Sequence, residues 1–301
     1  MIKSINNRIL YFFCWGLSIL AFYHMSAQDQ PNIIFIMADD LGYGDVGLYG
    51  QQRIKTPNID RLGSGGIKFT DYYSGAAVCA PARSVLMSGL HTGHTRVRGN
   101  FGKGGVVGLA GKKGRVPIKK EDLTIAEVLQ EQGYRTAMIG KWGLGEPNTS
   151  GAPNKKGFDY FYGFYNQRRA HSYYPEYLWE NTEKIILHGN EKEANHQYTH
   201  NLFADQTINF IDRNHHQPFF LYLPVCIPHS RYELPDDGMY THKKNWTDLQ
   251  KKYAAMVTRL DETVGRIVKR LEVLGIAENT YIFFTSDNGP AEISVEWPLS
   301  D

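Results

Sequence analysis

A cysteine, Cys79, opens a segment whose residue types suit nucleophilic chemistry. From position 79 the segment reads Cys-Ala-Pro-Ala-Arg and continues Ser-Val-Leu-Met-Ser-Gly. Pro81 suits the first turn of a helix, where its missing N–H costs no hydrogen bond. The positive end of that helix would favour an anionic reaction centre at the Cys79 side chain. The alternative is a buried structural cysteine, the commonest fate of a lone cysteine.

Oxygen-bearing side chains follow two predicted strands that lie far apart in the chain. Asp39-Asp40 follows the apolar run 32–38, and Asp287-Asn288 follows the apolar run 281–285. An Asp-Asp pair before glycines is, by itself, more often a turn. In an open α/β sheet, however, ligands bind outside the carboxyl ends of the strands, so the two pairs are expected to converge. Three carboxylates and an amide oxygen suit a hard cation, Ca²⁺ or Mg²⁺.

The elements that must position these residues alternate short apolar runs with helical patterns. Strands are predicted over 32–38, 67–72, 134–139, 218–225 and 281–285, and helices over 57–62, 81–89, 124–132, 202–214 and 249–275. This alternation predicts an α/β fold with a mostly parallel central sheet and helices on both faces. Lys141 and His229 each follow one of the predicted strands, so they are expected at the same edge as the acidic pairs.

Five blocks of this chain resemble the sulfatases of the alkaline phosphatase superfamily. In the family's order they are Met-Ala-Asp-Asp-Leu-Gly-Tyr-Gly-Asp from 37, Cys-Ala-Pro-Ala-Arg from 79, Gly-Lys-Trp from 140, Ile-Pro-His from 227 and Ser-Asp-Asn-Gly from 286. The resemblance covers 32–290 and implies an alkaline-phosphatase-like, arylsulfatase-like enzyme. It also implies that a formylglycine-generating or maturase enzyme oxidises Cys79 to formylglycine.

The resemblance also assigns roles to individual side chains. It implies that Asp39, Asp40, Asp287 and Asn288 bind calcium, with magnesium as the other possible ion, and that the side chain of residue 79 is a further ligand. Arg83 and Lys141 would position formylglycine and sulfate. His229 would contact the sulfate ester or assist the leaving oxygen.

The chemistry of formylglycine accounts for these residue types. Its hydrated aldehyde carries two hydroxyls on one carbon: one attacks sulfur and releases the alcohol, and the second is then deprotonated so that the aldehyde reforms and sulfate leaves. Arg83, Lys141 and the metal ion would supply positive charge to the sulfuryl group. Histidine suits the movement of protons. In isolation, Lys141 could be a surface lysine and His229 a packed loop histidine, but a shared strand edge argues against both.

Two features depart from the family's pattern. Many sulfatases have Lys-x-His where this chain reads Lys141-Trp142-Gly143. His171 could replace that histidine from a neighbouring loop, or it could be an ordinary loop or substrate-facing histidine. The sequence also stops at Asp301, before the second sulfate-contacting lysine and the C-terminal antiparallel subdomain of the family. We therefore expect a catalytic domain over 28–301 without that subdomain.

The N-terminal residues have the layout of a secretory signal peptide. Lys3 and Arg8 precede the apolar run 9–22, and Ala27 offers a cleavage point. An uncleaved anchor is the alternative, but the run is short for a stable membrane span. A signal peptide over 1–27 would direct export, so we expect a periplasmic or extracellular protein. Only two cysteines would remain, which argues against a disulfide scaffold. The net charge is +2 and the chain has no long basic run, so the charge does not indicate nucleic-acid binding.

The segment 160–179 is rich in aromatic residues and contains Arg168, Arg169 and His171. It is either a substrate loop, with rings stacking on a sugar or aryl group and arginines meeting anions, or a packed insertion. The expected substrate is a sulfated carbohydrate or an aryl sulfate ester. Two alternatives remain: a phosphoester or phosphonate hydrolase of the same superfamily, and a truncated, catalytically silent binding protein.

Overall fold

A computed structural model describes residues 30–100 and 117–290 of the chain. The chain divides into two units, Met1–Pro31 and Asn32–Asp301, and the fold below is that of the second unit. The predicted signal peptide therefore lies outside the described residues. Among the described helices, none combines the length and the apolar character that a membrane crossing requires.

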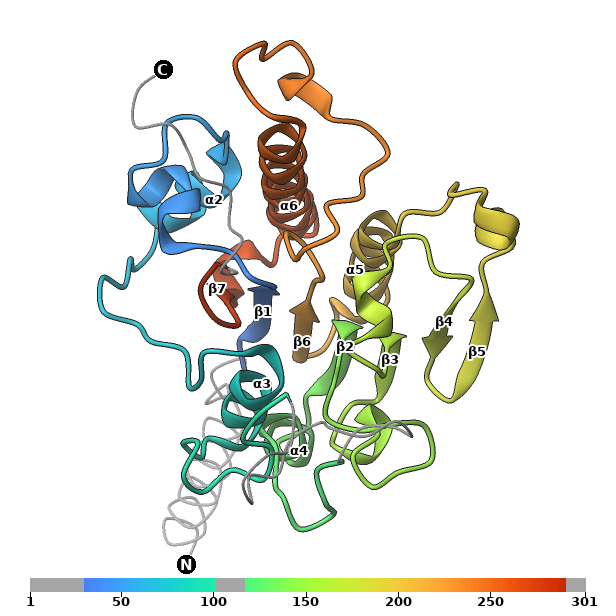
Figure 1. Cartoon of the computed structure of the whole chain (residues 1–301). Helices are drawn as coiled ribbons and strands as arrows, with labels where there is room; N and C mark the ends of the chain where they lie inside the picture. The colour runs from blue at the N-terminus through green and yellow to red at the C-terminus, as the bar shows by residue number, and fades with distance from the viewer. Residues whose placement is uncertain (1–29, 101–116, 291–301) are drawn as a thin grey trace, which may run out of the picture. The chain divides into compact units, whose positions relative to one another are not determined.

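A single seven-stranded sheet organises the described part of this unit (Figure 1). Its order is β5-β4-β3-β2-β6-β1-β7. The strands are β1 Asn32–Ala38, β2 Arg135–Lys141, β3 Tyr160–Phe164, β4 Tyr177–Glu180, β5 Glu183–Ile186, β6 Phe219–Pro224 and β7 Thr280–Ser286. β1 runs parallel to β6 and β7, and β2 runs parallel to β3 and β6. Only β4 and β5 are antiparallel to their neighbours. The mostly parallel sheet predicted from the sequence is confirmed.

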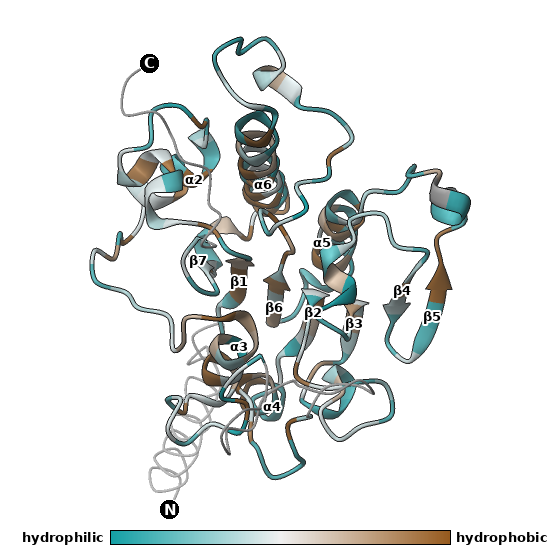
Figure 2. Ribbon diagram, viewed as in Figure 1, coloured by the Kyte–Doolittle hydropathy of each residue, from teal (hydrophilic) through white to brown (hydrophobic). Residues whose placement is uncertain are grey.

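Two apolar cores cover the two faces of this sheet, because successive side chains of a strand point to opposite faces. On β1, Ile34 and Ile36 pack into one core, whereas Phe35 and Met37 contact the other. The first core is closed by α5 Thr199–Asn214 and α6 Asp248–Val273. The second is closed by α3 Cys79–Ser88 and α4 Ile125–Glu131. Figure 2 shows the apolar strands between these helices. The prediction of helices on both faces is also confirmed.

Most predicted elements lie within a few residues of their observed bounds. The short helix α2 spans Pro57–Ser64, and its sequence places proline at the first helical position. Thr124 and Thr247 cap α4 and α6 by accepting the backbone N–H of Glu127 and Gln250, respectively. These local signals explain why the helix starts could be located from the sequence.

The strand predicted over 67–72 was wrong. This segment connects α2 to α3 as bends, and Ile67 is 80% exposed. Its apolar side chains are not buried by any sheet face, since Phe69 and Tyr72 are each 56% exposed, so the burial that would favour a strand is missing. Conversely, β3 and the start of β4 were missed because they lie in 160–179, the segment interpreted as a loop or insertion, and no strand was predicted at β5.

Candidate active site

The carboxyl ends of β1 and β7 bring the two predicted acidic pairs together. Ala38 and Ser286 are register partners, and Asp287 donates its backbone N–H to the Ala38 carbonyl over 3.0 Å. Asp40 in turn donates its backbone N–H to Asp287 Oδ1 over 3.2 Å. Asp40 has a φ of 63°, a left-handed conformation that aspartate adopts more readily than most residues. The chain therefore turns sharply here and keeps Asp39 and Asp40 over the strand ends.

Four side chains from three distant segments offer ligand atoms to one point. The ligand atoms of Asp39, Asp40, Cys79 and His229 all lie within 4.8 Å of one another. His229 Nε2 lies 3.4 Å from Asp40 Oδ2. Asn288 approaches the same carboxylate and donates its amide to Asp40 Oδ1 over 2.6 Å. All the residues predicted as ligands therefore meet at one edge of the sheet.

Helix α3 begins at Cys79, two positions earlier than the predicted helix start at Pro81. Val78 precedes it in an extended conformation and supplies no side-chain cap. One N-terminal N–H of the helix, that of Ala80, is bound instead by Asn100 Oδ1 over 3.1 Å. The Cys79 side chain thus lies at the positive end of the helix, as the sequence predicted.

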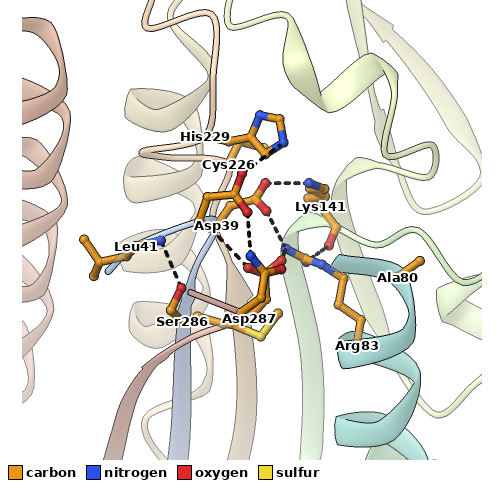
Figure 3. Close-up of polar contacts among 12 residues, drawn as sticks. Asp39, Leu41, Ala80, Arg83, Lys141, Cys226, His229, Ser286 and Asp287 are labelled. Atoms are coloured by element: carbon orange, nitrogen blue, oxygen red, sulfur yellow. Dashed lines mark hydrogen bonds and ion pairs between the residues drawn. The ribbon is translucent and has the colours of Figure 1, made fainter. Parts of the chain in front are cut away.

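Arg83 lies one helical turn after Cys79 and is fully buried beneath the acidic cluster (Figure 3). Its guanidinium donates to the Lys141 carbonyl over 2.6 Å and to Asp287 Oδ2 over 2.9 Å. It also lies 3.6 Å from Asp39 Oδ1. Since a buried cation is costly unless it is paired, these carboxylates explain how Arg83 is accommodated here.

A second buried cation, Lys141, comes from the last residue of β2. Its Nζ lies 2.5 Å from Asp39 Oδ2, and both side chains are withdrawn from solvent. Burial alone would raise the pKa of Asp39, but Lys141 and Arg83 lower it below its usual range. Burial opposes the charge on Lys141 as well, yet Asp39 raises the lysine pKa above its ordinary value. The pair therefore remains ionised.

Burial is the largest cause of the pKa shifts of two further groups, Cys79 and Asp287. Burial raises the pKa of the Cys79 thiol, and the nearby Lys141 does not offset it. As a free thiol, Cys79 therefore lacks the low pKa that activates cysteine nucleophiles. Burial and the neighbouring Asp39 raise the pKa of Asp287 to about 6, although Arg83 opposes the shift.

Two buried oxygens of this donor set lack a partner that a hard cation would supply. Within the described residues, Asp39 Oδ1 and Asn288 Oδ1 are buried and have no hydrogen-bond partner. A buried oxygen without a partner is energetically costly, and a cation would satisfy it. Carboxylate and amide oxygens are the ligands that calcium and magnesium prefer. The residues present therefore fit such an ion.

Comparison with known proteins decides the family. The family model described as Sulfatase matches residues 31–293. The chain belongs to the sulfatase family. It is 35% identical over 286 residues to an arylsulfatase of Hemicentrotus pulcherrimus, which covers 89% of this chain and 48% of that protein. It is 31% identical to N-acetylgalactosamine-6-sulfatase of Homo sapiens over 89% of this chain and 52% of that protein. The chain thus spans about half the length of these curated relatives.

A solved structure agrees with this sulfatase assignment. The crystal structure of Ps i-CgsB in complex with k-i-k-neocarrahexaose has a TM-score of 0.75 and 32% identity to this chain. The match covers 87% of this chain and 59% of that one. The prediction of an alkaline-phosphatase-like sulfatase fold is confirmed.

The position where many sulfatases carry a histidine is closed to a side chain in this member. Gly143 has a φ of +87°, and a Cβ placed on it would lie 2.4 Å from Gln167 Cγ. The space at Gly143 is therefore filled by the buried side chain of Gln167. His171, the predicted substitute, comes from the 3-10 turn Arg169–His171, and its ring lies 4.1 Å from that of His229, measured between centroids. It therefore lies beside the acidic cluster.

Arg168 does not join the buried cluster. It is exposed and lines a cavity on the neighbouring strand β3, together with Arg169. Of the two interpretations of 160–179, neither holds for the whole segment: Tyr160–Phe164 and Tyr177–Glu180 are strands of the sheet, and the residues between them form the loop.

Sequence reasoning missed two residues that hold the site in place. The hydroxyl of Tyr173 donates to the carbonyls of Cys226 and His229, over 3.0 and 2.7 Å. The hydroxyl of Ser74 donates to the Asp287 carbonyl. Tyr173 thereby fixes the segment that carries His229, and Ser74 fixes the segment that carries Asp287. Neither residue has a local sequence signal, because both contacts are made to main-chain atoms far along the chain.

Proposed function

We propose that this chain is the catalytic domain of a sulfatase that hydrolyses sulfate esters through formylglycine at position 79. One observation carries this proposal: the side chain of residue 79 lies at the N-terminus of α3, within 4.8 Å of ligand atoms of Asp39, Asp40 and His229. A nucleophile, acidic ligands and a histidine would then act on one sulfur atom. The raised pKa of the free thiol is consistent with the oxidised residue, rather than cysteine itself, being the nucleophile.

The cation would be held by Asp39, Asp40, Asp287 and Asn288, with residue 79 as a further ligand, and we propose calcium. When bound, it would supply positive charge to the sulfate oxygens. Lys141 and Arg83 have two functions in this proposal. They keep Asp39 ionised as a ligand, and they add fixed positive charge near residue 79, where the transferring group is negative. Because both cations are buried, this field is preorganised before the substrate binds.

His229 is the candidate for proton transfer to the leaving oxygen. Its Nε2 lies 3.4 Å from Asp40 Oδ2, and its side chain is buried except for 11% of its surface, through which a substrate would contact it. Its backbone carbonyl accepts the Tyr173 hydroxyl, which restricts the movement of the imidazole. His171 and Arg168 are the candidates for contact with the rest of the substrate.

The substrate class follows from the relatives and from the chemistry of the site. The similar proteins are named arylsulfatase and N-acetylgalactosamine-6-sulfatase, and the matched crystal structure is a complex with k-i-k-neocarrahexaose. We propose a sulfated carbohydrate or an aryl sulfate as substrate. We also propose export to the periplasm or the extracellular space through residues 1–27, and maturation of Cys79 by a separate formylglycine-generating or maturase enzyme.

The test uses the chain co-expressed with a formylglycine-generating enzyme. Mass spectrometry of the peptide that spans residue 79 reports the modification, and hydrolysis of para-nitrophenyl sulfate and para-nitrophenyl phosphate reports the reaction. We expect turnover of the sulfate in preference to the phosphate, and none in Cys79→Ala. Preferential phosphate hydrolysis would favour the phosphoesterase alternative. Calcium binding by fully modified protein without any sulfate hydrolysis would favour the silent binding protein.

A further inference from the structure

A cavity of about 310 Å³ lies beside the proposed active site. It opens at the carboxyl end of β3, where Phe164 is the register partner of Lys141. Neighbouring strands are about 4.8 Å apart, so the cavity begins one strand away from the buried lysine. Its lining includes Glu146, Tyr165, Arg168, Arg169, Tyr177 and Trp179.

A short loop connects this cavity to the acidic cluster. The 3-10 turn Arg169–His171 begins with a residue that lines the cavity and ends with a residue that stacks on His229. His229 reaches Asp40 at the cluster. A ligand anchored over residue 79 that extends past His171 would therefore enter the cavity.

The chemistry of the lining indicates what enters. Among the described residues, neither Arg168 nor Arg169 has a carboxylate within ion-pair distance. The Arg169 guanidinium lies 3.9 Å from the centroid of the Tyr177 ring, which orients it without neutralising its charge. Two arginines against one glutamate give the cavity a net positive charge. An anionic group is therefore the complement of this side of the cavity.

The other walls favour a sugar over an aryl group. Glu146 lines the cavity and accepts a hydrogen bond from the Asn166 amide over 2.5 Å. A carboxylate accepts hydrogen bonds, which sugar hydroxyls can donate and an unsubstituted aromatic ring cannot. The half-buried Trp179 provides an apolar wall. A sugar ring with an anionic substituent complements all three: the substituent faces the arginines, the hydroxyls can donate to Glu146, and the ring can pack on Trp179.

We propose that this cavity binds a second, negatively charged sugar ring of a sulfated oligosaccharide, next to the ring whose sulfate ester reaches residue 79. The inference presupposes the sulfatase site proposed above. It adds that the substrate is an anionic oligosaccharide and that Arg169 selects for the charge on its second ring.

The test measures binding without turnover. The full chain with Cys79→Ala is titrated, in calcium buffer, with a galactose disaccharide that carries a sulfate on each ring and with the same disaccharide sulfated on the first ring only. A third arm replaces the second sulfate by a carboxylate. We expect the disulfated compound to bind about five- to tenfold more tightly than the monosulfated one. If the carboxylate increases affinity as much as the sulfate does, the cavity recognises negative charge alone. If only the sulfate increases affinity, the cavity recognises the shape of the sulfate group as well.

Two variants make the assignment specific. Arg169→Ala should remove the preference for the charged second ring, because it deletes a cation of the cavity. Lys184→Ala is the matched control: Lys184 also lies 3.9 Å from the Tyr177 ring centroid but does not line the cavity, so the preference should persist. Equal affinity for both disaccharides, or an undiminished preference in Arg169→Ala, would overturn the proposal. Hydrolysis of para-nitrophenyl sulfate by the unsubstituted, modified chain reports the proposed function separately, since this compound carries no second ring.

Discussion

The imidazole rings of His171 and His229 stack with their planes inclined by 29° and their centroids 4.1 Å apart. The contact joins the loop of 165–176 to the segment that follows β6. It gives His171 a means of positioning His229, whether or not His171 touches the substrate. In the proposed mechanism His229 transfers a proton, and reactivity depends steeply on the orientation of such a group, so the loss of this support should slow the reaction.

The stacking predicts an order of activities at position 171. We expect His171→Ala to lower kcat/KM for para-nitrophenyl sulfate about tenfold, and His171→Phe to recover most of that loss because a ring is restored. Steady-state kinetics of the modified enzymes measure the difference. If phenylalanine proves as damaging as alanine, the imidazole itself takes part and the positioning role is wrong.

The buried pair of Lys141 and Asp39 predicts a large loss of stability when only one partner is removed. Lys141→Met leaves the Asp39 carboxylate buried without its nearest cation, which should cost about 3–5 kcal/mol of unfolding free energy. Urea unfolding in the presence of a calcium chelator measures this cost, and the double variant with Asp39→Asn should regain part of it.

Lys156→Met provides the matched control for that experiment. Lys156 is equally buried, but its partner Glu127 is 23% exposed and can be hydrated when the lysine is lost. We therefore expect a smaller loss than at Lys141. Equal losses would show that the removal of a buried lysine, and not the stranded Asp39 charge, determines the cost.

Calcium should stabilise the folded chain through the unsatisfied oxygens of the site. Free calcium at a concentration 100 times its dissociation constant adds about 2.7 kcal/mol to the unfolding free energy. We expect Asp40→Asn to abolish most of the calcium-induced rise in Tm, because the variant removes a charged ligand from the cluster. Glu131→Gln removes one exposed negative charge at the end of α4 and should leave the rise unchanged. An undiminished rise in Asp40→Asn would place the ion elsewhere.

The sequence was most informative where function depends on strand ends and helix starts. Asp39 and Asp287 could be paired because strand ends converge in a parallel sheet, and Cys79 could be placed because proline marks a first helical turn. The sequence could not show that Arg83 binds Asp287, 204 positions away, or that Tyr173 binds the His229 carbonyl. These contacts depend on tertiary packing, for which local periodicity carries no signal. Short antiparallel strands such as β4, with four residues, likewise offer too few positions for a pattern.

His200 predicts a specific loss of stability in acid. Burial lowers its pKa from 6.5 to about 3, and its Nε2 lies 2.8 Å from Thr263 Oγ1 between α5 and α6. Between these two pKa values the unfolded chain binds a proton that the folded chain does not bind. The stabilisation is therefore complete above the unfolded pKa and is lost as the pH falls towards 3, at up to about 1.4 kcal/mol per pH unit.

His200→Gln tests this prediction, because glutamine does not titrate. Chemical unfolding at a series of pH values from 7 to 4 should show a shallower decline for the variant than for the unsubstituted chain. His242→Gln, at an exposed position, should leave the decline unchanged. Parallel curves for the unsubstituted chain and His200→Gln would contradict the assignment.

The contact between Gly143 and Gln167 predicts that a histidine cannot simply be restored at position 143. A side chain there would require a positive φ and would overlap Gln167 Cγ, which is buried and has little room to move. We expect Gly143→Ala to lower the unfolding free energy by about 2–4 kcal/mol.

Gly89→Ala separates backbone strain from the overlap with Gln167, because Gly89 also has a positive φ but a Cβ there would contact nothing within 4 Å. The loss should therefore be smaller at Gly89, and adding Gln167→Ala to Gly143→Ala should recover part of the loss at Gly143. If the two single alanine variants unfold alike, backbone strain alone keeps glycine at position 143.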